Sequence, residues 1–486
     1  MSTEILVSGT PEGYDAKIIL NEIKHQGNSV IHIARDDKRM RAMGDALKFF
    51  KPDLAVFEFP SWDCLPYDRV SPNLEISSAR MGILSKFADN IAKEYVVLTT
   101  LNAVLQKVPC SSVVKSYGFK AVVGRNINES NLREFLVRMG FTKSSTVREA
   151  GEYAIRGGII DIFPPRYSNP VRLDLFGTIL DGARLFDPET QLTIKKLHEI
   201  ELAPVSEVVL DEFSIRNFRQ SYRAEFGSSL SNDPLYESVS AGRKYQGLEH
   251  WLPLFYEKLD TFFSYFPSAT VTMYKNLETD LSSRCKLVAD QYEARNFAND
   301  NKPTKDYAYK PLKPTALYLD EADWVNLIKT RRTLIFDPLP QPLGPNIIDS
   351  GGRAGRNFAP ERQSNNLNLF SSLADHLKTR LQSGPVLIAS YSEGSLERLS
   401  GLLTDEGLDR PVAVSNWSMV TSPVVHMSVW PLDQGFQTPE FTVISEQDIL
   451  GERLIRRPKK RRPENEKNRT RVNNKCQTKK EPLANF

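Results

Sequence analysis

Short apolar runs alternate with amphipathic segments over the first 118 residues. The apolar runs have the length of buried strands and cover residues 5–7, 29–34, 54–57 and 95–99. The segments at residues 15–24 and 37–50 instead show the apolar spacing that is typical of helices. Buried strands that alternate with helices predict a parallel α/β sheet.

The pattern changes near residue 119, where alternation of single residues replaces the apolar runs. Between residues 152 and 187 apolar and polar side chains alternate, with turn residues at 164–170 and at Gly177. Such hairpins predict a small antiparallel sheet with one half-exposed face. We assign this sheet to residues 119–203.

The remaining chain returns to a mixed pattern. Residues 204–330 combine helical segments with long loops, and residues 335–450 form a further α/β unit. The strand patterns of that unit cover residues 385–389, 424–429 and 441–444, and a helical pattern covers 393–403. Residues 451–486 are polar and poor in apolar side chains, so we expect a disordered basic tail.

The net charge of +3 conceals an asymmetry between body and tail. Residues 451–486 hold 13 Lys or Arg against 4 Asp or Glu, a net of +9, so the other 450 residues carry −6. The candidate nucleic-acid contacts of the tail are Arg456, Arg457, Lys459, Lys460, Arg461 and Arg462. No aromatic residue is interleaved with them, and a solvated linker is the interpretation we prefer.

The spacing of the cysteines and the hydropathy of the chain restrict the cellular compartment in which we expect the protein. Cys64, Cys110, Cys285 and Cys476 lie far apart without a CxxC pair, which favours reduced thiols over a zinc site. The N-terminus lacks the pattern of a secretory signal. No apolar run approaches the ~20 residues that span a bilayer. We therefore expect a cytoplasmic protein with no metal site and no membrane partner.

The segment after the first apolar run has the glycines of a phosphate loop without its chemistry. A GxxxxGK[ST] loop cradles phosphates with backbone amides, neutralises them with Lys and holds Mg²⁺ through a hydroxyl. Here Gly9 and Gly13 are present, but Tyr14 and Asp15 follow the second glycine. The chain contains no Gly-Lys-Ser or Gly-Lys-Thr, so we expect a degenerate loop that binds no nucleotide.

The run Asp320-Glu321-Ala322-Asp323 spells the acidic box of a helicase family. Such a box holds Mg²⁺ next to a phosphate loop at the end of a buried strand. The residues that follow it continue as a helical pattern, and acidic side chains are favourable in the first turn of a helix. We interpret the run as the start of a helix.

Several stretches carry a family pattern when they are taken together. The first is Trp62-Asp63-Cys64-Leu65-Pro66-Tyr67-Asp68-Arg69-Val70-Ser71-Pro72, which is followed closely by Ile76-Ser77-Ser78-Ala79-Arg80. The others cover residues 151–164, 171–177, 184–191, 256–267 and 446–453. Together they resemble the bacterial transcription-repair-coupling factors, whose N-terminal third is similar to the excision-repair helicase UvrB. The resemblance covers about residues 1–453.

The resemblance implies an order of domains. Residues 1–118 and 204–330 would form one degenerate helicase-like domain, interrupted at residues 119–203 by a UvrA-binding domain. The small α/β domain at 335–450 and the tail at 451–486 would follow. Only a short stretch joins Tyr67 to Arg80, too short for the hairpin with which UvrB-type proteins probe damaged DNA. We do not expect damage verification by this domain.

Members of this family also carry an RNA-polymerase-interaction domain and an ATP-driven DNA translocase, which we expect this chain to lack. The resemblance therefore implies an adaptor of nucleotide excision repair that recruits UvrA, with no enzymatic activity and no cofactor of its own. Two alternatives stay open. The chain could serve a translocase whose motor is a separate chain, or it could be a non-functional truncated product.

The second stretch contains the candidate binding residues. A period of two places Val171, Leu173 and Leu175 on the core face of a strand and Arg172, Asp174 and Phe176 on the other face. The residues alone favour a solvated face with Phe176 covered by a neighbouring loop. The resemblance implies instead that Arg156, Arg172 and Phe176 contact UvrA. It is also compatible with Glu152, Asp161 and Asp174 positioning the arginines through ion pairs.

Arginine and aromatic side chains dominate the binding energy of many interfaces. We therefore expect Arg172→Ala or Phe176→Ala to weaken UvrA binding by roughly 2 kcal/mol or more and to leave the fold intact.

Overall fold

A seven-stranded sheet organises the largest part of the molecule. The computed structural model describes residues 4–88, 94–227, 233–300, 309–364, 366–421 and 423–451. The strand order is β17-β1-β16-β15-β2-β4-β3, and every pairing is parallel. The strands are β1 (Glu4–Ser8), β2 (Val30–Ala34), β3 (Ala55–Phe59), β4 (Tyr95–Thr100), β15 (Thr270–Tyr274), β16 (Thr333–Asp337) and β17 (Ile347–Asp349). The parallel α/β sheet expected from the apolar runs is confirmed.

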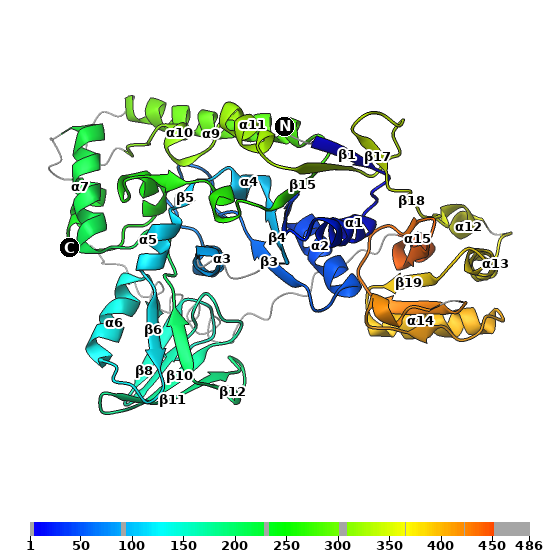
Figure 1. Ribbon diagram of the computed structural model, residues 1–486, viewed down its shortest axis with the longest axis horizontal. Coiled ribbons are helices and arrows are strands. Elements are labelled where there is room, and N and C mark those ends of the chain that lie inside the picture. The colour runs from blue at the N-terminus through cyan, green and yellow to red at the C-terminus, as the bar shows by residue number, and fades with distance from the viewer. Residues whose placement is uncertain are drawn as a thin grey trace, which may run out of the picture.

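Helices pack on both faces of this sheet (Figure 1). They include α1 (Tyr14–Gln26), α2 (Asp37–Phe50), α3 (Leu74–Ala88), α4 (Leu101–Val104), α5 (Ser111–Ser116), α9 (Leu277–Asp300) and α11 (Glu321–Lys329). The acidic run lies at the start of α11, where the Asp320 side chain caps the helix by accepting from the Asp323 amide at 2.7 Å. Its interpretation as a helix start is confirmed.

The sheet extends further along the sequence than the boundary at residue 330 allows. Strand β16 pairs with β1 on one side and with β15 on the other, and β17 adds beyond β1. Residues 333–349 therefore belong to the first sheet rather than to the small domain expected from residue 335. Strand β16 is nearly all buried, as expected for an inner strand of a parallel sheet that helices cover on both faces.

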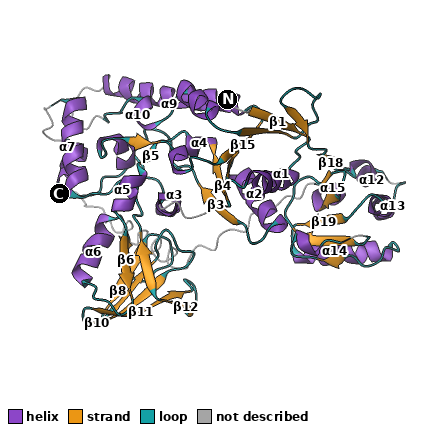
Figure 2. Cartoon of the chain, in the orientation of Figure 1, coloured by secondary structure: helices purple, strands orange, loops and turns teal. Residues whose placement is uncertain are grey.

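A second sheet is formed by the residues inserted between β4 and β15. Its order is β12-β11-β10-β9-β8-β7, antiparallel except for the β7–β8 pair. The strands are β7 (Thr142–Lys143), β8 (Glu152–Arg156), β9 (Ile159–Ile162), β10 (Val171–Phe176), β11 (Ile179–Phe186) and β12 (Thr193–Leu197). The antiparallel hairpins expected here are confirmed (Figure 2).

One face of the second sheet is covered by a helix, whereas the other is buried around Ala154 and Phe186 and exposed near the turn between β10 and β11. Helix α6 (Glu129–Arg138) contributes Leu132 and Leu136 to a core that also contains Val171 and Leu173 of β10. The two-stranded ladder of β6 (Phe119–Val122) and β13 (Glu199–Leu202) adjoins this core. The opposite face, which we call the outer face, carries the alternate residues of β8 to β11.

Aromatic side chains fill a helical region beside the first sheet. Its elements are α7 (Glu212–Phe226), α8 (Pro234–Ser240), α10 (Pro314–Leu317), the 3₁₀ helices η1 (Leu248–Leu254) and η2 (Phe262–Tyr265), and the short pair β5 (Val108–Pro109) and β14 (Leu259–Asp260). Tyr67, Phe218, Trp251 and Phe255 meet in its core. The Tyr67 ring lies 5.7 Å from that of Tyr292 on α9 and 6.5 Å from that of Tyr318, so the loop that carries it is held against this core.

A third sheet, of order β18-β22-β23-β19-β21-β20, lies beside α1 and α2 (Figure 1). Its strands are β18 (Arg353–Ala354), β19 (Val386–Ser390), β20 (Val412–Ala413), β21 (Val425–Val429), β22 (Phe436–Gln437) and β23 (Thr442–Ser445). Its helices are α12 (Ala359–Gln363), α13 (Leu369–Leu381), α14 (Glu393–Asp405), η3 (Trp417–Met419) and α15 (Glu446–Leu450). The α/β character expected for this region is confirmed.

The first and third sheets share one hydrophobic core. Phe49 of α2 stacks on Trp430 with ring centroids 4.8 Å apart, and Phe50 lies 5.3 Å from Trp417. Phe436 of β22 lies 5.8 Å from Tyr14 of α1. Such a continuous aromatic contact ties the two sheets together far more tightly than a polar domain interface would.

A buried ion pair joins the first motif to the inserted residues. The Arg80 guanidinium and the Glu207 carboxylate are both fully buried, 2.8 Å apart. Arg80 also donates to the Pro60 carbonyl and stacks on Phe59 at 4.3 Å. Trp62 donates from Nε1 to the other Glu207 oxygen at 3.0 Å. The motif is therefore a structural joint between α3, the loop before it and the end of the insertion.

Burial keeps His32 neutral at the centre of the first sheet. Its ring lies between β2 and β15, where Nδ1 is 2.9 Å from the Thr272 hydroxyl. Burial, and secondarily Arg39, lowers the His32 pKa to about 3. An unfolded histidine has a pKa of about 6.5, so the unfolded chain binds the extra proton between these two values. The contribution of His32 to stability is therefore complete above pH 6.5 and is lost as the pH falls towards 3.

We predict that His32→Gln makes the folded chain less sensitive to acid. At pH 5 the protonation of unfolded His32 should lower the free energy of unfolding of the wild type by about 2 kcal/mol, a loss that the variant does not suffer. Urea unfolding of both proteins at pH 7 and pH 5 measures the difference. Parallel losses in the two proteins would contradict the prediction, and His25→Gln, at an exposed position, is the control.

Candidate functional site

The outer face of the second sheet combines arginine, carboxylate and exposed apolar side chains. Strand register places Arg172 opposite Asp161, and Asp161 opposite Ala154. One row further, Ile159 lies opposite both Arg156 and Asp174. Because directly opposed residues point to the same side of a sheet, all of these side chains share the outer face.

Asp161 holds both candidate arginines. Its carboxylate is only 2% exposed and accepts from Arg172 Nε at 2.6 Å and Nη2 at 2.9 Å. The second oxygen also accepts from Arg156 Nη2 at 3.2 Å. The Arg172 contact is the bidentate geometry in which an arginine–carboxylate pair is strongest. The expectation that Asp161 positions the arginines fits this arrangement.

The two arginines differ in how much of the guanidinium group is exposed and free to bind a partner. Arg172 is 18% exposed, stacks on the buried Phe186 ring at 4.4 Å and donates to Gln191 at 3.2 Å. Arg156 is 54% exposed and makes a single bond to Asp161. Arg172→Ala would leave the Asp161 carboxylate with one partner in a buried position, so it should cost folding stability as well. Arg172 is thus a poorer test of binding than the sequence indicates.

Phe176 stands out as the exposed aromatic of this face. Its side chain is 80% exposed at the end of β10, next to the turn at Gly177. Its cross-strand partner Ile179 and the neighbouring Ile159 are exposed as well. The alternative in which a neighbouring loop covers Phe176 is wrong. The ring lies at the turn of the β10–β11 hairpin and is exposed, whereas Phe186 at the other end of β11 is buried.

The other two carboxylates have roles that differ from the expectation. Asp174 pairs with Arg184 of β11 and not with Arg156 or Arg172. Glu152 accepts from the backbone amides of Arg148 at 2.8 Å and Glu149 at 3.0 Å, so it orders a loop rather than an arginine. Sequence reasoning also missed Arg184 as a third arginine of the face, although its opposition to Arg172 would follow from the hairpin register.

The degenerate phosphate loop is occupied by the protein's own side chains. The Asp15 carboxylate accepts from the amides of Gly13 and Ala16, both at 2.9 Å, where the first turn of α1 would offer its amides to a phosphate. Arg39 of α2 pairs with Asp15 at 3.0 Å and with Glu12. Burial raises the Asp15 pKa to about 6.

Other segments close the same loop from outside. A side chain at Gly9 would meet Arg353 and Gly352 at 2.7 Å, and one at Gly13 would meet the Phe436 ring at 2.9 Å. Both glycines also have positive φ, which favours glycine. They are therefore needed for close packing against the third sheet and the segment before it. Close packing therefore explains the presence of both glycines, and no bound nucleotide is needed to explain them.

We infer that the loop binds no nucleotide and predict no thermal stabilisation by ATP with Mg²⁺. A ligand present at a hundred times its Kd would add about 2.7 kcal/mol to the free energy of unfolding. Differential scanning fluorimetry with increasing ATP, and with MgCl₂ alone as the control, measures the effect. A melting temperature that rises with ATP concentration would show that Asp15 can be displaced.

Some expectations from the sequence fall outside the described residues. Arg456, Arg457, Lys459, Lys460, Arg461 and Arg462 all do, as does Cys476. Among the residues that are described, no group of three His, Cys, Asp or Glu side chains could hold a metal ion. No helix in this part of the chain has the length and apolar character needed to cross a membrane.

Comparison with known proteins places the outer face in a named domain. The family model described as the UvrB interaction domain matches residues 119–208, and that described as the MFD, D3 domain matches residues 379–449. The transcription-repair-coupling factor of Rickettsia bellii is 25% identical over 432 residues, 89% of this chain and 37% of that protein. That of Escherichia coli is 28% identical over 450 residues, with shares of 91% and 38%. That of Myxococcus xanthus is 31% identical over 247 residues, with shares of 49% and 20%.

Fold and matches together define an α/β protein in which a UvrB-type interaction domain is inserted into a parallel sheet. The chain is similar to the transcription-repair-coupling factors over about nine tenths of its own length, and it spans about 37% of the length of the first of these relatives.

Proposed function

We propose that this chain recruits UvrA in transcription-coupled nucleotide excision repair through the outer face of its second sheet. One observation supports the proposal above all others. The domain matched by the UvrB interaction model exposes Arg156 and Phe176 on its outer face. The resemblance assigned Arg156, Arg172 and Phe176 to UvrA contact.

The three side chains divide into two roles in this proposal. Phe176 and Arg156 contact UvrA, since an exposed ring can fill an apolar socket and an exposed guanidinium can meet a carboxylate. Arg172 acts mainly through Asp161, because its own donors are engaged within the domain. The proposed partner surface therefore carries an apolar socket beside an acidic group.

We predict that Phe176→Ala weakens binding to purified UvrA by about 2 kcal/mol, roughly thirtyfold in Kd. Arg156→Ala should weaken it by about 1 kcal/mol or more. Isothermal titration calorimetry with UvrA measures both. The matched controls are Phe297→Ala on α9, whose side chain is 71% exposed, and Arg133→Ala on α6, which is 51% exposed.

Unchanged circular dichroism and melting temperature of Phe176→Ala are part of the expected result, since surface substitutions usually change stability by less than about 0.5 kcal/mol. If a folded wild-type chain bound UvrA no better than Phe176→Ala did, the proposed role of the outer face would be wrong.

A further inference from the structure

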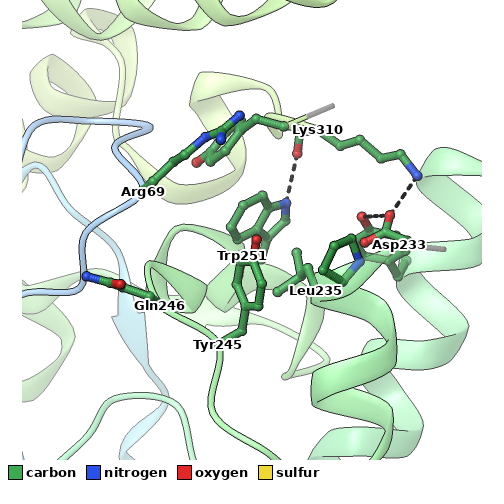
Figure 3. A pocket seen from close by; sticks show the side chains of 10 residues that line it. Arg69, Asp233, Leu235, Tyr245, Gln246, Trp251 and Lys310 are labelled. Carbon is green, nitrogen blue, oxygen red and sulfur yellow. Dashed lines mark hydrogen bonds and ion pairs between the residues drawn. The ribbon is translucent and has the colours of Figure 1, made fainter. Parts of the chain in front are cut away.

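The loop that carries the first motif forms one wall of a cavity that the proposed function does not use. Arg69 and Gln246 come from one side, Asp233 and Leu235 from the opposite side, and Trp251 and Tyr245 lie between them (Figure 3). Tyr222, Tyr309, Pro234 and Lys310 complete the lining. The volume of about 280 Å³ lies near the lower end of ligand sites.

The backbone of this loop is held in an unfavourable conformation that fixes Arg69. Tyr67 has a φ of 59°, uncommon for a bulky residue, and its ring is buried. Arg295 donates to the Tyr67 carbonyl at 2.8 Å. On the other side a side chain at Gly247 would meet the Arg69 backbone at 2.9 Å, and the Gly247 amide donates to Ser71 at 2.8 Å. Strain that the surroundings maintain in this way clusters at ligand sites.

The polar groups of the cavity separate into engaged and available ones. Asp233 accepts from Tyr222 at 2.7 Å and from Lys310 at 2.9 Å, so its charge is already compensated. Arg69 is exposed, and its guanidinium makes no hydrogen bond or ion pair within the part of the chain that is described. Gln246 is exposed beside it. The cavity therefore offers a cation and an amide to a ligand.

Aromatic rings form the floor. Trp251 and Tyr309 lie 4.6 Å apart, and the Trp251 N–H donates to the Lys310 carbonyl at 2.8 Å, which fixes the indole. Both of these rings are buried, whereas Tyr245 is half-buried and is the aromatic residue available to a base. A basic group beside an aromatic platform is the combination that binds single-stranded nucleic acid, in which bases stack and phosphates meet cations.

A second cavity continues the first. Its volume is about 300 Å³, and it shares Tyr245 and Gln246 with the first cavity. Ser71 and Pro72 line it further along the same loop, and Lys244 and Glu249 line it from the start of η1 and the residues before it. The Glu249 carboxylate accepts from the Ser71 hydroxyl at 2.7 Å. Two adjoining cavities along one wall suit successive units of a chain better than they suit a single small molecule.

We propose that this groove binds single-stranded nucleic acid, with a base against Tyr245 above the Trp251 floor and a phosphate at Arg69. The proposal is independent of UvrA binding, because the groove lies on the helical region and the outer face lies on the second sheet. DNA and RNA share the chemistry on which it rests, and the 2′-hydroxyl distinguishes them only at the sugar.

The test measures fluorescence anisotropy of labelled oligothymidylate and oligouridylate of about 12 nucleotides with the full chain, a length within the usual site size. Arg69→Glu and Tyr245→Leu should each raise Kd about tenfold. The matched control is Arg41→Glu, which makes the same change of charge at an exposed position of α2. Any binding through the basic residues beyond position 451 should be the same in this control and in Arg69→Glu.

Photo-cross-linking with an iodouracil-substituted oligonucleotide gives a readout that a loss of stability would not mimic. Cross-links in the peptide that contains Tyr245 would support the proposal. Equal Kd values for Arg69→Glu and Arg41→Glu would overturn it, and so would cross-links confined to residues 452–486. Displacement of the oligonucleotide by a proline-rich peptide and not by unlabelled oligonucleotide would assign the groove to a peptide and also overturn it.

Discussion

Glu207→Ala should lower the free energy of unfolding by about 3–5 kcal/mol, the usual cost of removing one partner from a buried ion pair. The substitution leaves the fully buried Arg80 guanidinium with the Pro60 carbonyl and the Phe59 ring, and removes the acceptor of the Trp62 indole. A charge stranded in this way has no access to water. Urea denaturation followed by tryptophan fluorescence measures the loss.

Two further variants separate the ion pair from the general effect of deleting a carboxylate. Glu94→Ala removes the partner of Lys51 in a pair in which both side chains are about half exposed, and should cost less than about 1 kcal/mol. Arg80→Met with Glu207→Leu removes both charges and should recover much of the stability, since apolar replacements of a buried pair are often neutral. If Glu207→Ala cost no more than Glu94→Ala did, the role of this pair as a structural joint would be refuted.

Phe436→Ala should destabilise the chain by about 3–5 kcal/mol, as large-to-small substitutions of buried aromatic residues do. The ring is fully buried among Tyr14, Trp430 and Phe441 and lies against Gly13. Its loss opens a cavity where the first and third sheets meet. Chemical denaturation of the purified chain gives the magnitude.

The control for Phe436→Ala is the same substitution at the exposed Phe176, which should change stability by less than about 0.5 kcal/mol. Because the shared core couples the two sheets, the wild type should unfold them together, with coincident transitions by fluorescence and circular dichroism. The shared core would be contradicted if the two sheets of the wild type unfolded in separate transitions and Phe436→Ala changed neither transition.

Local pattern was sufficient for much of the fold. The apolar runs became β1 to β4, and single-residue alternation placed Val171 and Leu173 inside and Phe176 outside. These predictions depend only on the spacing of apolar residues along strands and helices, which is visible in short stretches of sequence. The helical start at Asp320 followed from the same local rules.

Contacts between distant residues were not readable in this way. Arg80 contacts Glu207, which lies 127 positions away in the sequence, and the local sequence around either residue does not predict this pairing. The commitment of Arg172 to Asp161 depends on hairpin register, so a residue assigned to binding is held largely within its own domain. Likewise β16 joined the first sheet, not the third, because its place is fixed by two strands far away in the sequence.

The carboxyl group of Asp15 gives the first turn of α1 a hydrogen-bond acceptor that is part of the chain and not a diffusible ligand. A fold that closes around a dissolved ligand gains stability only in proportion to the logarithm of that ligand's concentration. Here the acceptor is a side chain in the first turn of α1 and pairs with Arg39, so its presence does not depend on the concentration of any solute. The first turn of α1 and its contact with Phe436 are thus held by groups of the chain itself, which makes this region a fixed frame between the first and third sheets.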